Sequence, residues 1–222
     1  MRWKFILGLL TTCAVLMSMS YTMLIPFLPM YLIQDLGVVK ADVDMWSGAI
    51  FAITFLVSGI MAPIWGALAD KKSRKLMALR AGFCLAITYF LGGLVTNPWE
   101  LLGVRFIQGL SAGLWPALLA IISVESPKLK LGFCMGVMQG GMTAGGVLGP
   151  LFGGLLADQF GMRMAFFIAA AALFLITLAL LFFVKEEPRK PDPNAKPVKI
   201  WDFSLCKIPA VKRMLICAGV VQ

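Results

Sequence analysis

Six long apolar runs constrain this chain more than any other feature of its sequence. A helix needs about 20 apolar residues to cross the hydrocarbon core of a bilayer, and each run reaches that length. The runs cover residues 5–32, 45–68, 76–95, 101–124, 133–157 and 164–184. Hydrophobic residues make up 60% of the chain, which leaves too few polar side chains to cover a soluble domain. The sequence therefore predicts an all-α integral membrane protein with six membrane-spanning helices.

Charged residues lie mainly between the runs, and their sign alternates from loop to loop. Clusters of Lys and Arg follow the second, fourth and sixth runs and account for most of the net charge of +9. The other loops carry Asp35, Glu100 and Asp158. Because basic loops stay in the cytoplasm, this pattern predicts a multi-pass protein of the cell (inner or plasma) membrane with a cytoplasmic N-terminus. The positive charge is explained by orientation, so no nucleic-acid partner is expected.

The end of the chain predicts a second part. Residues 185–213 are charged and rich in proline, which is typical of a cytoplasmic linker. A seventh apolar run, 214–222, is too short to span a bilayer. We therefore expect a six-helix bundle over residues 1–184, a linker over 185–213, and the truncated start of a C-terminal bundle at 214–222. On this interpretation the chain is a fragment of a longer protein.

The residue content argues against an enzyme. Histidine is absent, which removes the usual catalytic triads and the commonest metal ligand. The five cysteines form no CxxC pair, so neither a disulfide framework nor a metal site is expected. No GxxxxGK[ST] loop occurs that would hold ATP. We expect no cofactor and no catalytic residue, and any active transport would be driven by an ion gradient or by a partner.

A short motif follows the second apolar run. It consists of Gly66, Leu68, Asp70, Lys71, Arg74 and Lys75. Asp70 would end a helix, where the helix dipole disfavours an acid, so it needs a cation or the N-terminus of another helix. A contact that closes a cytoplasmic gate would meet this need. The alternative is that the basic residues only orient the chain.

The motif has a weaker counterpart at the end of the fifth run. Residues 154–158 repeat the small, apolar and acidic pattern of residues 66–70, and an arginine comes shortly after each copy, Arg74 after Asp70 and Arg163 after Asp158. The first copy would face the cytoplasm and the second the outside. This arrangement predicts two inverted three-helix repeats, a signature of secondary transporters, with Asp158 and Arg163 as the external mirror of the gate. Chance similarity in a chain rich in Gly, Leu and Ala is the alternative.

Arg105 places a positive charge inside the fourth run. Gln108 and Gly109 follow one turn later, on the same face of the predicted helix. A charge inside a membrane span is a functional candidate by default. The alternative is that Arg105 snorkels to the outer interface, because it lies only about 7 Å along the helix from Glu100.

Glycines recur at every fourth position of the fifth run. One ladder contains Gly132, Gly136 and Gly140, and the other contains Gly141, Gly145, Gly149 and Gly153, with Pro150 and Gly154 beside its last members. This spacing leaves a groove in which a second helix can approach to backbone contact. Proline removes one backbone hydrogen bond and bends a helix. The run is therefore predicted to be a tightly packed and moving element.

These motifs together resemble those of the major facilitator superfamily, and more narrowly its twelve-helix drug:proton antiporters, over residues 5–190. The loop from Gly66 to Lys75 matches the signature between helices two and three, with Ser73 where a glycine is usual. Arg105 matches an arginine that is implicated in proton coupling, and Gln108 and Gly109 belong to the same signature. The helix-five signature of antiporters is matched by Gly136, Gly145, Gly149, Pro150, Gly153 and Gly154.

The resemblance implies alternating access between two six-helix bundles, with the Asp70 loop locking the cytoplasmic side. The expected activity is efflux of drugs or other small amphipathic compounds, with the proton gradient as energy source. The expected partners are a small-molecule substrate, protons, the lipid bilayer and the missing C-terminal half. Two alternatives stay open: a proton-coupled exporter of a specific sugar or metabolite, and a non-transporting half that acts only as a membrane partner.

Overall fold

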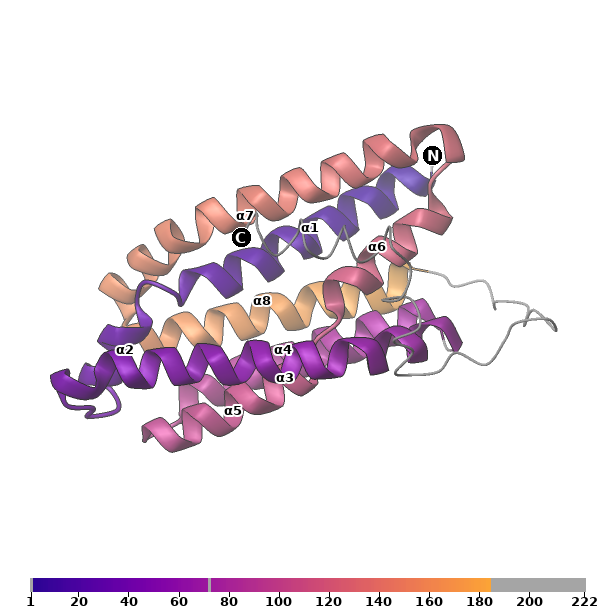
Figure 1. Cartoon of the computed structure of the whole chain (residues 1–222). Helices are drawn as coiled ribbons and strands as arrows, with labels where there is room; N and C mark the ends of the chain where they lie inside the picture. Colours follow the sequence, from indigo (N-terminus) through magenta and orange to yellow (C-terminus); the bar gives the residue numbers. More distant parts are fainter. Residues whose placement is uncertain (1, 72, 185–222) are drawn as a thin grey trace, which may run out of the picture. The chain divides into compact units, whose positions relative to one another are not determined.

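The computed structural model describes residues 2–71 and 73–184, and this part is built from helices (Figure 1). The predicted linker and seventh run, residues 185–222, lie outside the described residues. The α-helices are α1 (Arg2–Met23), α2 (Leu28–Gln34), α3 (Val43–Lys71), α4 (Arg74–Leu94), α5 (Pro98–Leu110), α6 (Leu114–Glu125), α7 (Leu131–Phe160) and α8 (Met162–Phe183). Two short 3₁₀ turns, Lys40–Asp42 and Lys128–Lys130, precede α3 and α7.

Six stretches are long and apolar enough to cross a membrane by length and composition. They are Trp3–Met23, Lys40–Gly66, Arg74–Leu94, Pro98–Glu125, Lys128–Phe160 and Met162–Phe183. Each overlaps one of the six predicted runs. The prediction of an all-α protein with six membrane-spanning segments is therefore confirmed, whereas the inverted relation between the two three-helix units stays a prediction.

The first predicted run, residues 5–32, is not one continuous helix as expected. Helix α1 ends at Met23, and the chain turns before the short helix α2 begins at Leu28. Pro26 lies in the turn, where it has no N–H to donate and disfavours helical geometry at Ile25. Pro29 falls in the first turn of α2, where a missing N–H costs nothing.

The fourth predicted run is also interrupted, between α5 and α6. Gly113, the N-cap of α6, has φ +117°, a conformation that favours glycine because it has no Cβ. Pro116 follows in the first turn of α6, where proline is tolerated. A run that is uniformly apolar in sequence thus contains two helices separated by a break.

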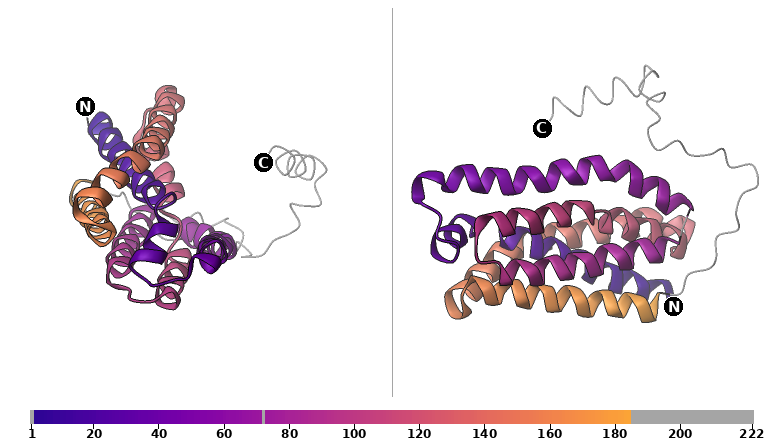
Figure 2. Two further views of the ribbon diagram at one scale, coloured as in Figure 1. Left: turned by 90° about the vertical axis from the view of Figure 1, so that its left-hand side faces the viewer. Right: turned by 90° about the horizontal axis from the view of Figure 1, so that it is seen from below.

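The helices run alongside one another, and pairing is not sequential (Figures 1 and 2). Helix α7 lies along α1, α4 along α8, and α3 along α5. Helix α4 is central, with 61% of its apolar stretch buried, against 17% for α3 and for α7. Two long helices therefore keep most of their apolar surface uncovered by the described bundle.

Candidate functional site

The second glycine ladder of α7 forms a groove that holds α1. A Cβ placed on Gly149 would lie 2.7 Å from the Met19 carbonyl oxygen, and one on Gly153 would lie 2.8 Å from the Met23 Cβ. Gly145 meets the backbone of Val15 still more closely. Backbone contact of this kind is what small residues permit between membrane helices.

The other members of the glycine signature lie elsewhere. A Cβ on Gly136 would meet no atom within 4 Å, and the same holds for Gly132 and Gly140. Gly154 lies against the Phe27 ring rather than against α1, at 3.2 Å from its would-be Cβ. Helix α7 continues through Pro150 to Phe160 without a break. The structure thus separates a packed glycine face from an open one on the same helix.

The loop signature lies where α3 ends and α4 begins. Gly66 and Leu68 belong to the last turns of α3, and the side chains of Asp70 and Lys71 lie outside the described residues. Ser73 is the N-cap of α4, and its hydroxyl oxygen accepts a hydrogen bond from the Leu76 N–H at 3.1 Å. Serine is a favoured N-cap, so this hydrogen bond stabilises the start of α4.

Lys75 has a specific partner on a distant helix. Its Nζ donates a hydrogen bond to the carbonyl oxygen of Leu181 at 2.6 Å. This carbonyl is among the last four of α8, which have no partner within that helix. A cation is favourable at that end of a helix, so Lys75 caps α8 and connects it to the start of α4.

The predicted external pair is not brought together as a pair. Arg163 Nε lies 3.1 Å from the Oδ1 of Asp35, the C-cap residue of α2, and both side chains are partly exposed. Asp158 is exposed near the end of α7 and makes no ion pair with any residue whose side chain is described. The sequence indicated Asp35 only as a charge in a loop. Its pairing with Arg163 could not be predicted, because the two residues are 128 positions apart and no local pattern connects them.

Arg105 lies inside the bundle, so the snorkelling alternative is wrong. Its side chain is 6% exposed and that of Gln108 is 4% exposed. Arg105 Nη1 donates a hydrogen bond to Gln108 Oε1 at 2.8 Å, as their spacing on one helix face predicts. The Arg105 carbonyl accepts a weaker hydrogen bond from the Thr54 hydroxyl of α3, at 3.4 Å.

Gly109 explains how α5 and α3 approach each other at this level. A Cβ on Gly109 would lie 2.8 Å from the Thr54 carbonyl oxygen and 2.8 Å from the Val57 Cβ. Any larger residue would push α3 away from the face that carries Arg105. The role of Gly109 in this structure is therefore close helix packing.

The charge of Arg105 is not matched by a described carboxylate. Tyr21 and Tyr89 are its polar aromatic neighbours, and the Tyr89 hydroxyl donates a hydrogen bond to the Ser20 carbonyl at 2.8 Å. Arg105 Nη2 and Gln108 Nε2 are buried, and among the described residues neither has a hydrogen-bond partner of good geometry, although the Tyr89 hydroxyl lies beside both side chains. Buried donors without partners are costly, so this pair is suited to bind an acceptor that comes from outside the described residues.

The fold and this site define a class: a helical membrane protein whose interior holds a positive charge that no described carboxylate matches. The sequence profile of the Major Facilitator Superfamily matches residues 10–218, and the chain belongs to this family. The family consists of transporters, so the chain belongs to a transporter family and not to a family of enzymes.

Close relatives carry a common name. The chain is 42% identical over 186 residues to the multidrug resistance protein MdtG of Citrobacter koseri, covering 83% of the chain and 46% of that protein. It is 40% identical over 187 residues to MdtG of Yersinia enterocolitica, covering 84% and 45%. The chain thus spans about half the length of the curated relatives that it matches.

Solved structures support the fold. A bacterial homolog of the human lysosomal transporter Spinster, in an inward-facing and unoccupied conformation, matches with a TM-score of 0.72 at 22% identity, over 93% of the chain and 48% of that structure. The POT family transporter PepTSo matches with a TM-score of 0.71 at 14% identity, over 85% and 40%. At these identities the likeness concerns the fold alone.

Proposed function

We propose that the protein to which this chain belongs exports drugs or other small amphipathic compounds across the cell membrane in exchange for protons. The observation that carries this proposal is the buried Arg105–Gln108 pair, with two donors that have no partner of good geometry in the described part of a chain 42% identical to a protein named for multidrug resistance. A charge kept inside a membrane bundle at such cost marks a substrate or ion pathway.

Arg105 would couple the proton to the substrate through a carboxylate. The acids whose side chains are described all lie near helix ends: Asp35, Asp42, Asp44, Glu100, Glu125 and Asp158. The acceptor for Arg105 Nη2 and Gln108 Nε2 is therefore supplied by the C-terminal half or by the substrate. A carboxylate beside Arg105 stays ionised, and it takes up a proton more readily once the arginine is engaged elsewhere.

Alternating access would use the two least buried helices, α3 and α7, as the surface for the second six-helix bundle. Large apolar side chains are exposed on both helices, among them Phe55 and Val147. Gly132, Gly136 and Gly140 leave an open face on α7 for the same contact. The end of α3, with Asp70 and Lys71, would close the cytoplasmic side, in the orientation that the basic loops predict.

Everted vesicles that contain the complete protein provide the test. Addition of an amphipathic cation or drug should collapse a preformed proton gradient, measured with a pH-sensitive dye. Arg105→Gln should abolish this signal, because the charge that couples substrate to proton is lost. Lys128→Gln removes an exposed charge on the predicted cytoplasmic side and should leave it unchanged.

Three results would contradict the proposal. Full coupling in the Arg105→Gln protein would show that this charge has no part in exchange. A gradient that collapses only with one hydrophilic solute would indicate the narrower sugar or metabolite exporter. If the complete protein gives no signal with any solute tried, exchange is contradicted and the alternative of a membrane partner is favoured.

A further inference from the structure

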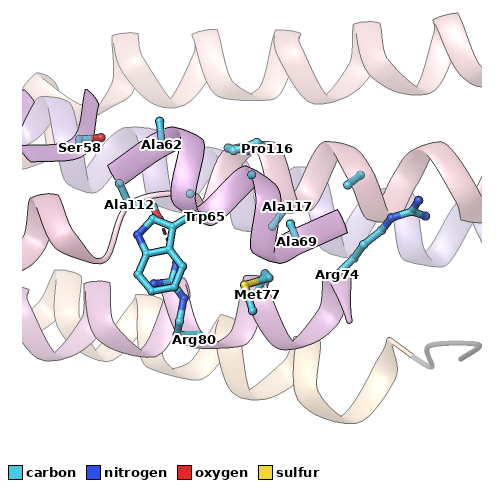
Figure 3. A pocket seen from close by; sticks show the side chains of 13 residues that line it. Ser58, Ala62, Trp65, Ala69, Arg74, Met77, Arg80, Ala112, Pro116 and Ala117 are labelled. Carbon is cyan, nitrogen blue, oxygen red and sulfur yellow. Dashed lines mark hydrogen bonds between the residues drawn. The ribbon is translucent and has the colours of Figure 1, made fainter. Parts of the chain in front are cut away.

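A cavity of about 400 Å³ lies between α3, α4 and α6, apart from the Arg105 site (Figure 3). It occupies the end of the bundle where α3 passes into α4. Helix α3 packs on α5 and α4 packs on α6 and α8, so the space between α3 and α4 is left free below the break at Gly113. The volume falls within the range of roughly 300–1,000 Å³ typical of small-molecule sites.

Most of the cavity wall is apolar and made of small side chains. Ala62 and Ala69 come from α3, Met77 from α4, and Ala117 and Ala120 from α6. A wall of this kind leaves room for an alkyl chain or a ring and offers it no hydrogen bond. The body of a ligand that fits here is therefore apolar.

Two arginines from one helix supply the charge. Arg74 begins α4 and Arg80 follows six residues later, about 9 Å along the helix axis. In Figure 3 Arg80 lies beneath the Trp65 ring, and Arg74 is at the far end of the group. Neither arginine pairs with a carboxylate among the side chains that the structure describes.

Arg80 is held in place by two neighbours. Its guanidinium carbon lies 3.4 Å from the centroid of the Trp65 ring, and its Nη2 donates to the Ala112 carbonyl at 3.0 Å. The Trp65 indole N–H donates in turn to the Leu110 carbonyl at 2.8 Å, which fixes the ring. A guanidinium has five N–H donors, so most of its capacity is left for a ligand.

We propose that this cavity binds an amphiphile with one acidic head group, such as a phosphate monoester or diester carrying an alkyl chain. Two guanidinium groups repel a cation. A neutral apolar ligand would displace water from them and offer no hydrogen bond in its place. A phosphate or carboxylate accepts paired hydrogen bonds from arginine, and the fixed orientation of Arg80 favours this contact. The alkyl chain lies against the alanines and Met77.

Such a ligand has two sources that share this chemistry. One is an anionic phospholipid of the cytoplasmic leaflet, to which the basic side of the bundle is attracted. The other is a soluble anionic amphiphile that enters from the aqueous phase. Binding in either case does not depend on transport, so the proposal stands or falls separately from the exchange activity.

Tryptophan quenching tests the proposal on the 222-residue chain purified in a neutral detergent. The probe is 4-bromobutyl phosphate, whose short chain keeps the bromine close to Trp65, and its cationic match is 4-bromobutyl trimethylammonium. We expect saturable quenching by the phosphate and none by the ammonium compound. The quenching should be lost in Trp65→Phe, because this ring lies in the wall of the cavity.

Three further variants separate binding from folding. Arg80→Gln should weaken phosphate binding by about tenfold, through the loss of charge-assisted hydrogen bonds. Ala120→Leu fills the cavity, keeps both arginines and should weaken binding by a similar factor. Lys128→Gln removes an exposed charge on the same predicted side and should bind as the unchanged chain does.

The outcomes are distinct. Equal quenching by the phosphate and ammonium probes overturns the proposal, and so does native affinity in folded Ala120→Leu, even if Arg80→Gln fails to fold. Displacement of the probe by phosphatidylglycerol in nanodiscs, but not by phosphatidylcholine, identifies a lipid as the ligand. Lack of displacement, together with the expected effects of the variants, identifies a soluble amphiphile.

Discussion

Lys75 Nζ lies 2.6 Å from the carbonyl oxygen of Leu181, so the start of α4 is bonded to the end of α8. These residues are 106 positions apart in the sequence. The motif in which Lys75 occurs was interpreted as part of a gate and as a determinant of orientation. In the structure one of its basic residues has a further role, which is to cap α8, the last of the described helices.

Lys75→Met should lower thermal stability because the α8 carbonyl loses its cationic partner. The site is exposed, so we expect a loss of about 0.5–1 kcal/mol, or roughly 1–4 °C in the melting temperature. Thermal unfolding of the purified chain measures this difference. Lys128→Met is the control, because the Lys128 side chain is exposed and donates no hydrogen bond to another described residue. Equal melting temperatures for the two variants would show that the bond contributes nothing.

Gly145→Ala and Gly136→Ala should have opposite effects although both lie on α7. The new methyl group at 145 would overlap the Val15 backbone, and we expect a destabilisation of about 1–3 kcal/mol. At 136 nothing lies within 4 Å, so alanine should be neutral or stabilise the helix by up to about 1 kcal/mol. Denaturant unfolding in detergent compares the two. A similar loss in both would mean that α1 does not lie in the groove.

Arg105→Met should abolish proton exchange without lowering thermal stability. The buried guanidinium has no described carboxylate partner, so its removal eliminates a desolvated charge while methionine fills the space. The vesicle assay gives the activity, and a melting curve of the same protein gives the stability. A fall of many degrees in the melting temperature would show instead that Arg105 is a structural residue.

Asp35 and Arg163 should couple weakly. Their side chains are 26% and 40% exposed, so solvent screens the attraction, and a double-mutant cycle should give about 0.3–1 kcal/mol. The coupling should shrink in high salt, because ions screen exposed charges. Asn and Gln are suitable replacements at 35 and 163. Asp158→Asn combined with Arg163→Gln is the matched cycle, and it should show no coupling.

The six spans could be predicted because membrane crossing imposes a length and a composition that are visible in every run. The Arg105–Gln108 contact could also be predicted, because two residues that are three positions apart on a helix lie on the same face. The breaks at Pro26 and Gly113 were missed because both occur within continuous apolar sequence. A proline or a glycine marks each break, but these residues also occur inside unbroken helices of this chain, as Pro63 does in α3, so they do not identify a break.

Contacts between distant residues could not be predicted. Nothing in the sequence near Arg163 indicates Asp35, and nothing near Lys75 indicates Leu181. Arg80 is different, because it is a charge inside the third apolar run and the reasoning used for Arg105 applies to it equally. Its position next to the basic cluster after the second run led to an interpretation as an orientation signal. Its contact with Trp65 could not be predicted, because that contact depends on how α3 and α4 are placed by their other neighbours.

The break between α5 and α6 has a consequence for the tolerance of this protein to substitution. It frees the carbonyl groups of Leu110 and Ala112 from helical bonding, and these are taken up by Trp65 and Arg80, from two other helices. Free backbone groups are sustained at membrane depth only where such partners exist. Substitutions at Trp65 or Arg80 will therefore harm the protein through the backbone at this break, which belongs to the helix of neither residue. A mutational survey that assigns each effect to the helix carrying the substituted residue will attribute this loss to α3 and α4, although its cause is the break between α5 and α6.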